Sequence, residues 1–222
     1  MFPPVSRNAL IPALLCLSLF SGPSTAADRA DMAVGKQIAM SGNGKGATAC
    51  QSCHGANGAG VAAANFPRLA GLNADYLAKQ LHDFASGTRS NPIMDPIAKS
   101  LTPEEAADVA AYYANEKAPH SAPAADEGLL GKGRRLVELG DWGKAVPACI
   151  MCHGPGANGV GTHFPALAGQ HAGYIASQLN AWKQGTRKND PNRLMTGIAE
   201  RLDPDQIKAV SAYLAGMQPA AH

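Results

Sequence analysis

Cys50-Gln51-Ser52-Cys53-His54 lies in the first half of the chain, and Cys149-Ile150-Met151-Cys152-His153 repeats its pattern in the second half. In Cys-x-x-Cys-His, two thiols three positions apart can add to the two vinyl groups on one edge of a porphyrin. The histidine that follows can then bind the iron. The sequence therefore predicts two covalent haem c groups, attached through Cys50 and Cys53 and through Cys149 and Cys152, with His54 and His153 as proximal iron ligands.

The two motifs belong to an internal repeat that covers most of the chain. Phe66-Pro67-Arg68-Leu69-Ala70-Gly71 returns as Phe164-Pro165-Ala166-Leu167-Ala168-Gly169. A repeat of this length predicts two domains with the same fold. We place the N-terminal domain at 28–117, an Ala- and Pro-rich linker at 118–126, and the C-terminal domain at 127–222.

Two methionines stand at equivalent places in the repeat. Met94 and Met195 each follow a Gly-Thr-Arg sequence, and we expect both on loops just before the last helix of their domains. A thioether is a common sixth ligand of haem iron and raises its reduction potential. Methionine is more often an ordinary core residue. The equivalent positions favour axial ligation, whereas no histidine outside the two motifs recurs in both halves.

The cysteine count restricts the chemistry. Of the five cysteines, Cys16 lies in the N-terminal segment and the other four lie in the two motifs. The competing interpretation is a structural zinc site built from both Cys-x-x-Cys pairs. The histidine after each pair and the paired methionines count against zinc. No cysteine is left for a thiolate ligand or a nucleophile.

The first 27 residues have the pattern of a signal peptide. Arg7 precedes the apolar stretch 9–20, and Ser24-Thr25-Ala26-Ala27 offers small residues for cleavage. The apolar stretch is too short to span a bilayer. The sequence thus predicts export to the periplasm, where haem c attachment takes place.

Composition restricts the class of protein further. The 222 residues carry a formal net charge of +2, and only 5% are aromatic. Without a basic run or stripe, nucleic-acid binding is not expected. Two domains of this size with few aromatic residues can form only small cores. A buried porphyrin would complete each core.

Helical patterns dominate, and no stretch predicts a strand. We expect three helices per domain. In the first domain they lie at 32–41, at 74–86 and after Thr102-Pro103-Glu104-Glu105. In the second domain they lie at 127–140, at 172–184 and after Asp203-Pro204-Asp205-Gln206. Both of these four-residue sequences predict a capping box with proline in the first turn.

Two further pairs of residues recur near the motifs. The carbonyls of Pro67 and Pro165 could accept from the haem histidines, and Arg89 and Arg187 could either pair with propionates or remain solvated.

These motifs resemble the cytochrome c4 family of periplasmic dihaem cytochromes. The resemblance implies an all-α protein with two tandem class I cytochrome c domains, each wrapped around one haem c. It implies axial pairs His54 with Met94 and His153 with Met195. It also implies an electron carrier that works between a quinol-oxidising complex and a terminal oxidase, loosely associated with the inner membrane.

Two other functions fit parts of the pattern. The chain could be the cytochrome subunit of a flavocytochrome c sulfide dehydrogenase or a similar periplasmic dehydrogenase. A catalytic dihaem enzyme such as a peroxidase or a thiosulfate dehydrogenase is less favoured. A peroxidase needs an open or displaceable iron position, whereas both methionines are present. Thiosulfate dehydrogenases use a cysteine ligand, and no cysteine is left for that role. We therefore expect an electron-transfer protein with redox-protein partners and no catalytic residues of its own.

Overall fold

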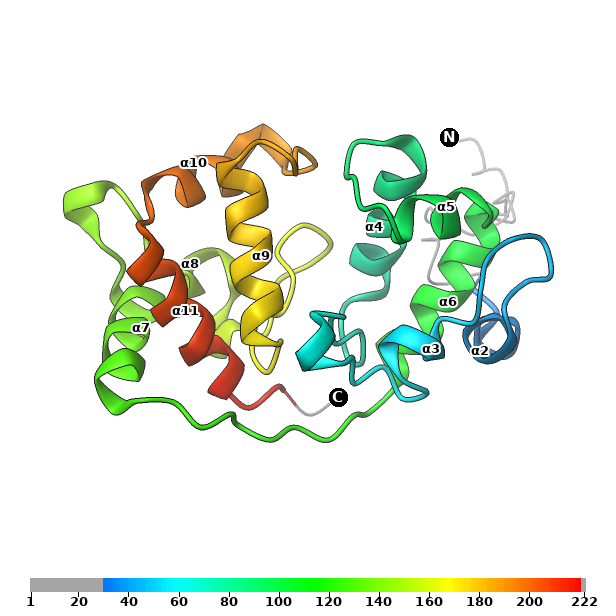
Figure 1. Cartoon of the computed structure of the whole chain (residues 1–222), viewed down its shortest axis with the longest axis horizontal. Coiled ribbons are helices and arrows are strands. Elements are labelled where there is room, and N and C mark those ends of the chain that lie inside the picture. The colour runs from blue at the N-terminus through cyan, green and yellow to red at the C-terminus, as the bar shows by residue number, and fades with distance from the viewer. Residues whose placement is uncertain (1–29, 221–222) are drawn as a thin grey trace, which may run out of the picture.

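The computed structural model describes residues 30–220, and in this range the regular structure is entirely helical apart from isolated β-bridges. Figure 1 shows two helical domains side by side, with α4 and α9 at the centre and a helix-free stretch running beneath both from α6 to α7. The expectation of two all-α domains is confirmed. The segment predicted as a signal peptide lies outside the described residues, and no described helix is long and apolar enough to cross a membrane.

Each domain contains three long helices and a few short ones. The N-terminal domain has α2 (Met32–Ser41), α3 (Gln51–His54), η1 (Ala62–Ala64), α4 (Ala74–Ser86), α5 (Met94–Lys99) and α6 (Pro103–Asn115). The C-terminal domain has α7 (Glu127–Leu139), η2 (Trp142–Lys144), α8 (Ile150–His153), η3 (Pro155–Ala157), α9 (Ala172–Lys183), η4 (Pro191–Arg193), α10 (Leu194–Arg201) and α11 (Pro204–Gly216).

The first and last helices of each domain cross closely. Helix α2 packs on α6, and α7 packs on α11. A glycine lies at each crossing: a Cβ added to Gly35 would be 2.0 Å from the carbonyl oxygen of Asp108, and one added to Gly133 would be 2.2 Å from that of Ala209. Only glycine lets the two backbones approach so closely.

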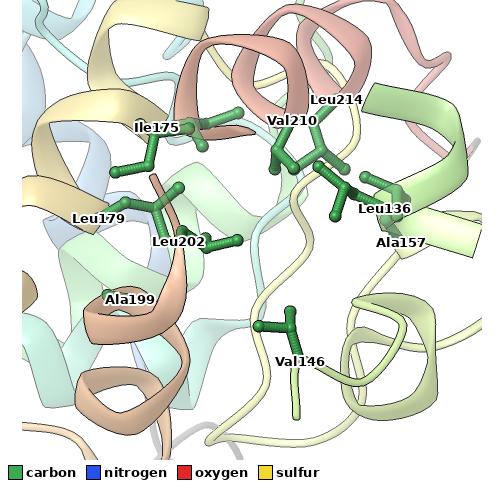
Figure 2. Packing of buried hydrophobic residues seen from close by; sticks show 11 residues of the cluster. Leu136, Val146, Ala157, Ile175, Leu179, Ala199, Leu202, Val210 and Leu214 are labelled. Carbon is green, nitrogen blue, oxygen red and sulfur yellow. The ribbon is translucent and has the colours of Figure 1, made fainter. Parts of the chain in front are cut away.

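Both cores are small. In the C-terminal domain, Leu136 of α7, Ile175 and Leu179 of α9, and Val210 and Leu214 of α11 converge on one another, as Figure 2 shows. The N-terminal core is smaller still, consisting of Ile38, Ala39, Leu77, Val109, Ala110, Tyr112 and Tyr113. Such cores are consistent with domains that are completed by a bound apolar group.

The sequence interpretation was wrong about the two methionine segments. Met94 is the first residue of α5, and Met195 is the second residue of α10, so neither lies on a loop. A polar side chain supports the start of α5. The amide oxygen of Asn91 accepts from the backbone N–H of Ile93 and Met94 at 2.9 and 3.0 Å.

Candidate functional site

One cavity of about 830 Å³ extends through both domains. Its walls contain every residue that the sequence singled out for haem binding: Cys50, Cys53, His54, Met94, Cys149, Cys152, His153 and Met195. The rest of the wall is largely apolar and is formed by α4, α5 and α6 in the N-terminal domain, by α9, α10 and α11 in the C-terminal domain, and by the loops between them. Residues that are far apart in sequence thus meet around a single space.

The two histidines are held in the same way. Each ends a four-residue helix that begins just after the first cysteine of its motif, α3 for His54 and α8 for His153. Their Nδ1 atoms lie 3.0 Å from the carbonyl oxygen of Pro67 and 2.7 Å from that of Pro165. A carbonyl only accepts, so Nδ1 carries the proton and Nε2 is the free nitrogen. The expected role of the two proline carbonyls is confirmed.

Burial sets the protonation of these groups. It lowers the pKa of His54 and of His153, and the hydrogen bonds to the proline carbonyls offset this effect only in part. Both imidazoles are therefore neutral at pH 7 and have a lone pair available for a metal. Burial also raises the pKa of the Cys50 and Cys149 thiols to about 11.

In each domain a carboxylate accepts a hydrogen bond from a backbone N–H near the methionine. The carboxylate follows the methionine in the N-terminal domain and precedes it in the C-terminal domain. In the N-terminal domain, the carboxylate of Asp95 accepts from the backbone N–H of Asn91 at 2.8 Å. In the C-terminal domain, the carboxylate is that of Asp190, which accepts from the backbone N–H of Thr196 at 2.8 Å. Asp95 and Thr196 each directly follow a methionine, so both networks fix the backbone beside the thioether.

The structure argues against the zinc alternative. Within residues 30–220, no three His, Cys, Asp or Glu side chains come together in a way that could hold a metal ion. The four thiols remain as two separate pairs, one in each domain. A tetrahedral Cys₄ site needs all four sulfurs around one ion.

Arg89 and Arg187 are not solvated, because each is only 6% exposed. They lie where the two domains meet, a boundary that we call the seam. Arg89 donates to Gln80 and Gln178, both at 2.9 Å or less. Arg187 donates to the same two glutamines, at 3.1 and 2.9 Å. The sequence showed that the arginines recur, but it did not show that they bond to glutamines across the domain boundary.

The four side chains form a nearly twofold ring that holds two buried cations and no carboxylate. Burial and the nearby charge of Arg89 lower the pKa of Arg187. The carboxylate of Asp83 acts on Arg89 only through its charge and is itself paired with Lys79 on the same helix. Buried charges are normally compensated by opposite charges. Because the ring residues line the cavity, a group with its own carboxylates would supply the missing anions.

The wall of the cavity therefore fits haem c. It offers paired thiols, an imidazole oriented by a carbonyl, a thioether, an apolar lining and two buried guanidinium groups for propionates. When bound, the haem supplies one-electron chemistry at its iron. The paired cysteines of this chain would attach it, the proline carbonyls would orient the two imidazoles, and Arg89 and Arg187 would neutralise its propionates.

Comparison with known proteins gives the family. The cytochrome c family model matches the chain twice, at residues 33–115 and 133–218. The chain belongs to the cytochrome c family. Its solved relatives include the reduced recombinant cytochrome c4 from Pseudomonas stutzeri, which is 33% identical with a TM-score of 0.75, over 85% of this chain and 100% of that chain. This cytochrome is thus a dihaem protein of the cytochrome c4 type, and it binds two haem c groups.

Two further relatives have more specific names. The "thiosulfate dehydrogenase electron acceptor" of Stutzerimonas stutzeri (strain A1501) is 50% identical over 85% of this chain and 88% of its own length. A structure of a thiosulfate dehydrogenase from Marichromatium purpuratum is 43% identical with a TM-score of 0.80. That match covers 86% of the cytochrome but only 41% of the longer protein. The names of both relatives therefore refer to thiosulfate dehydrogenase, one as its electron acceptor and the other as the dehydrogenase itself.

Proposed function

We propose that this cytochrome works in the periplasm as the electron acceptor of a dehydrogenase, with thiosulfate dehydrogenase as the first candidate. The observation that carries the proposal is the 50% identity to a protein named for that role. The thiosulfate dehydrogenase structure, which contains a region similar to nearly all of this cytochrome, gives further support. Two haems let one molecule accept two electrons before it passes them on toward the respiratory chain.

The proposal includes the iron ligands. His54 and Met94 ligate the first iron, and His153 and Met195 ligate the second. All four side chains line the cavity, and both histidines have Nε2 free because Nδ1 donates to a proline carbonyl. With both axial positions filled by protein, the irons transfer electrons and have no open position for a substrate.

Reduction kinetics test the donor. The oxidised cytochrome is mixed anaerobically with a thiosulfate dehydrogenase and thiosulfate, and the haem absorbance is followed by stopped flow. We expect two reducing equivalents to enter per chain, at a rate that increases with dehydrogenase concentration. A quinol-oxidising complex with quinol serves as the competing donor. Rapid reduction by that complex alone would assign the cytochrome to the quinol branch instead.

Methionine substitutions test the ligands. We expect Met94→Ala and Met195→Ala each to remove about half of the long-wavelength sulfur–iron charge-transfer band of the oxidised protein. Each variant should also lower one of the two reduction potentials, because the thioether favours ferrous iron. Met40→Ala is the control, since Met40 does not line the cavity. An unchanged band in either cavity variant would refute that ligand.

A further inference from the structure

The methionine segment of the C-terminal domain departs from its counterpart in the repeat. Eight positions separate Met195 from Arg187, whereas the matching separation in the N-terminal domain is five. The longer segment contains η4, and its residues Asn192 and Arg193 both have left-handed backbone, with φ of 54° and 56°. No residue of 89–94 has a positive φ. Left-handed backbone is unfavourable for residues with a Cβ, and proteins retain it mainly at functional sites.

This longer segment forms part of the mouth of the cavity. Pro191, Asn192 and Leu194 line the cavity and are also exposed to solvent. Leu194 is 51% exposed, and it directly precedes Met195, the proposed ligand of the second iron. In Figure 1 the segment is the orange connection between α9 and α10, at the top of the C-terminal domain. A protein that covers Leu194 would therefore lie beside the second haem.

Exposed cations accompany this leucine. The stretch 183–202 contains four of them and only two carboxylates, those of Asp190 and Glu200. The four exposed cations are Lys183, Lys188, Arg193 and Arg201. Contacts gather them around α10. Lys183 donates to the backbone carbonyl of Glu200 at 3.2 Å, and the guanidinium of Arg193 lies 3.5 Å from the carboxylate of the same residue.

Most of this positive charge is not neutralised by the protein itself. Three of the four cations have no ion-pair partner among the described residues. The fourth, Arg193, keeps a side chain that is 78% exposed. In the matching stretch 85–101, the one exposed cation, Lys99, is balanced by the carboxylate of Asp95. The excess of exposed positive charge therefore lies at the mouth beside Met195 and not at the one beside Met94.

We propose that Leu194 and the four cations around α10 form the docking surface for an acidic face of the protein that donates electrons. An apolar centre with a polar rim is the usual composition of a protein interface. The cations attract carboxylates on the partner from a distance and orient it before contact. One electron then leaves the reduced cofactor of the donor and reduces the ferric iron of the second haem. The inference rests on the proposed transfer from a donor protein, and it holds for either of the two donors named above.

Charge reversal tests the surface. The oxidised holoprotein is mixed with whichever of the two donors reduces the unaltered cytochrome, and the second-order rate constant is measured. We expect Lys188→Glu combined with Arg201→Glu to lower this constant about tenfold at low salt. The deficit should disappear near about 0.5 M salt, where surface charges are screened. Lys99→Glu is the matched control in the N-terminal domain and should change the constant less than about twofold.

Three further measurements separate docking from other effects of the substitutions. Reduction by hydroquinone, a small uncharged molecule, should proceed at the same rate in the double variant, and the sulfur–iron band of the oxidised protein should be unchanged. An unchanged constant with the protein donor, an equal loss in Lys99→Glu, or a matching loss with hydroquinone would overturn the proposal. Loss of binding to phosphatidylglycerol vesicles with unchanged reduction by the donor would assign the surface to lipid instead. The unaltered cytochrome identifies the donor and the variants test the surface, so each proposal can fail alone.

Discussion

Gly58 and Ala157 show how two copies of one fold can diverge at a single contact. Both residues have positive φ, 68° and 56°, and the carbonyl of each accepts from two successive backbone N–H groups in the loop after the Phe-Pro sequence. A Cβ added at Gly58 would lie 2.7 Å from a ring carbon of Tyr113. The repeat places Leu214 where the N-terminal domain has Tyr113, and the smaller side chain leaves room for the methyl group of Ala157.

We predict that Gly58→Ala lowers the free energy of unfolding of the holoprotein by about 1–3 kcal/mol, because it adds a clash in a packed core. Strain at positive φ adds to this cost. In a Tyr113→Leu background the contact with the ring is removed and only the one with the backbone nitrogen of Ala70, at 2.9 Å, remains, so the same substitution should cost less. Guanidinium unfolding followed by circular dichroism measures both effects. A double-mutant cycle with a coupling energy near zero would contradict this account.

At the scale of the element, local sequence signals were sufficient to predict the long helices. The capping box of Thr102 and Glu105 is present, as is that of Asp203 and Gln206. Hydrophobic spacing and caps act over a few residues, so they can be read from the chain directly. Helices α5 and α10 were missed because they are short, and because proline and asparagine near Met94 and Met195 suggested loops.

The glycines at the helix crossings could not be interpreted from sequence alone. Gly131 and Gly133 both lie in α7, and nothing in the spacing of the helix distinguishes them. The structure does distinguish them. A Cβ at Gly131 would meet nothing within 4 Å, whereas one at Gly133 would meet the backbone of Ala209 in α11. The difference depends on a partner helix that lies far along the chain.

We predict that alanine substitutions at Gly131 and Gly133 change the free energy of unfolding in opposite directions. Gly133→Ala should lower the free energy of unfolding by about 1–3 kcal/mol, since the backbone of α11 must move away. Gly131→Ala should raise it by up to about 1 kcal/mol, because alanine has the higher helix propensity. Thermal unfolding of the two variants, measured side by side with both haems attached, provides the comparison. Changes of the same sign in both variants would show that the crossing does not determine the effect.

At the scale of the molecule, the contacts between the domains explain why the repeat is more than two separate cytochromes. The arginine–glutamine ring joins α4 and α9, and an antiparallel bridge links Arg89 with Arg187. On the other side of the seam, the guanidinium of Arg68 donates to the carbonyls of Ala118 and Pro119 and so holds the connecting stretch. Sequence reasoning predicted which residues the structure gathers around the cavity, because they recur in both halves. It did not predict the seam, because the partners lie about a hundred residues apart with no local signal.

Gln170 provides the sharpest test of this coupling. It is 6% exposed, and its side-chain amide pairs with the backbone of Arg68 in the other domain. Its oxygen accepts from the N–H of Arg68 at 2.9 Å, and its nitrogen donates to the carbonyl oxygen at 2.8 Å. Gln170→Ala removes both bonds and also the one that Gln170 accepts from the backbone N–H of His171 at 3.0 Å, so the N–H and the carbonyl of Arg68 are left buried and unpaired. Each unpaired group costs about 1–3 kcal/mol, so the domains should dock less tightly.

Calorimetry of the reduced holoprotein can measure this loss. We expect Gln170→Ala to broaden or divide the unfolding transition, because domains that dock weakly melt more independently. Gln37→Ala is the matched control. Gln37 is exposed on α2, so its removal should change the stability by less than about 0.5 kcal/mol. A single transition at the temperature of the unaltered protein would mean that the pairing of Gln170 with Arg68 does not couple the two haem domains.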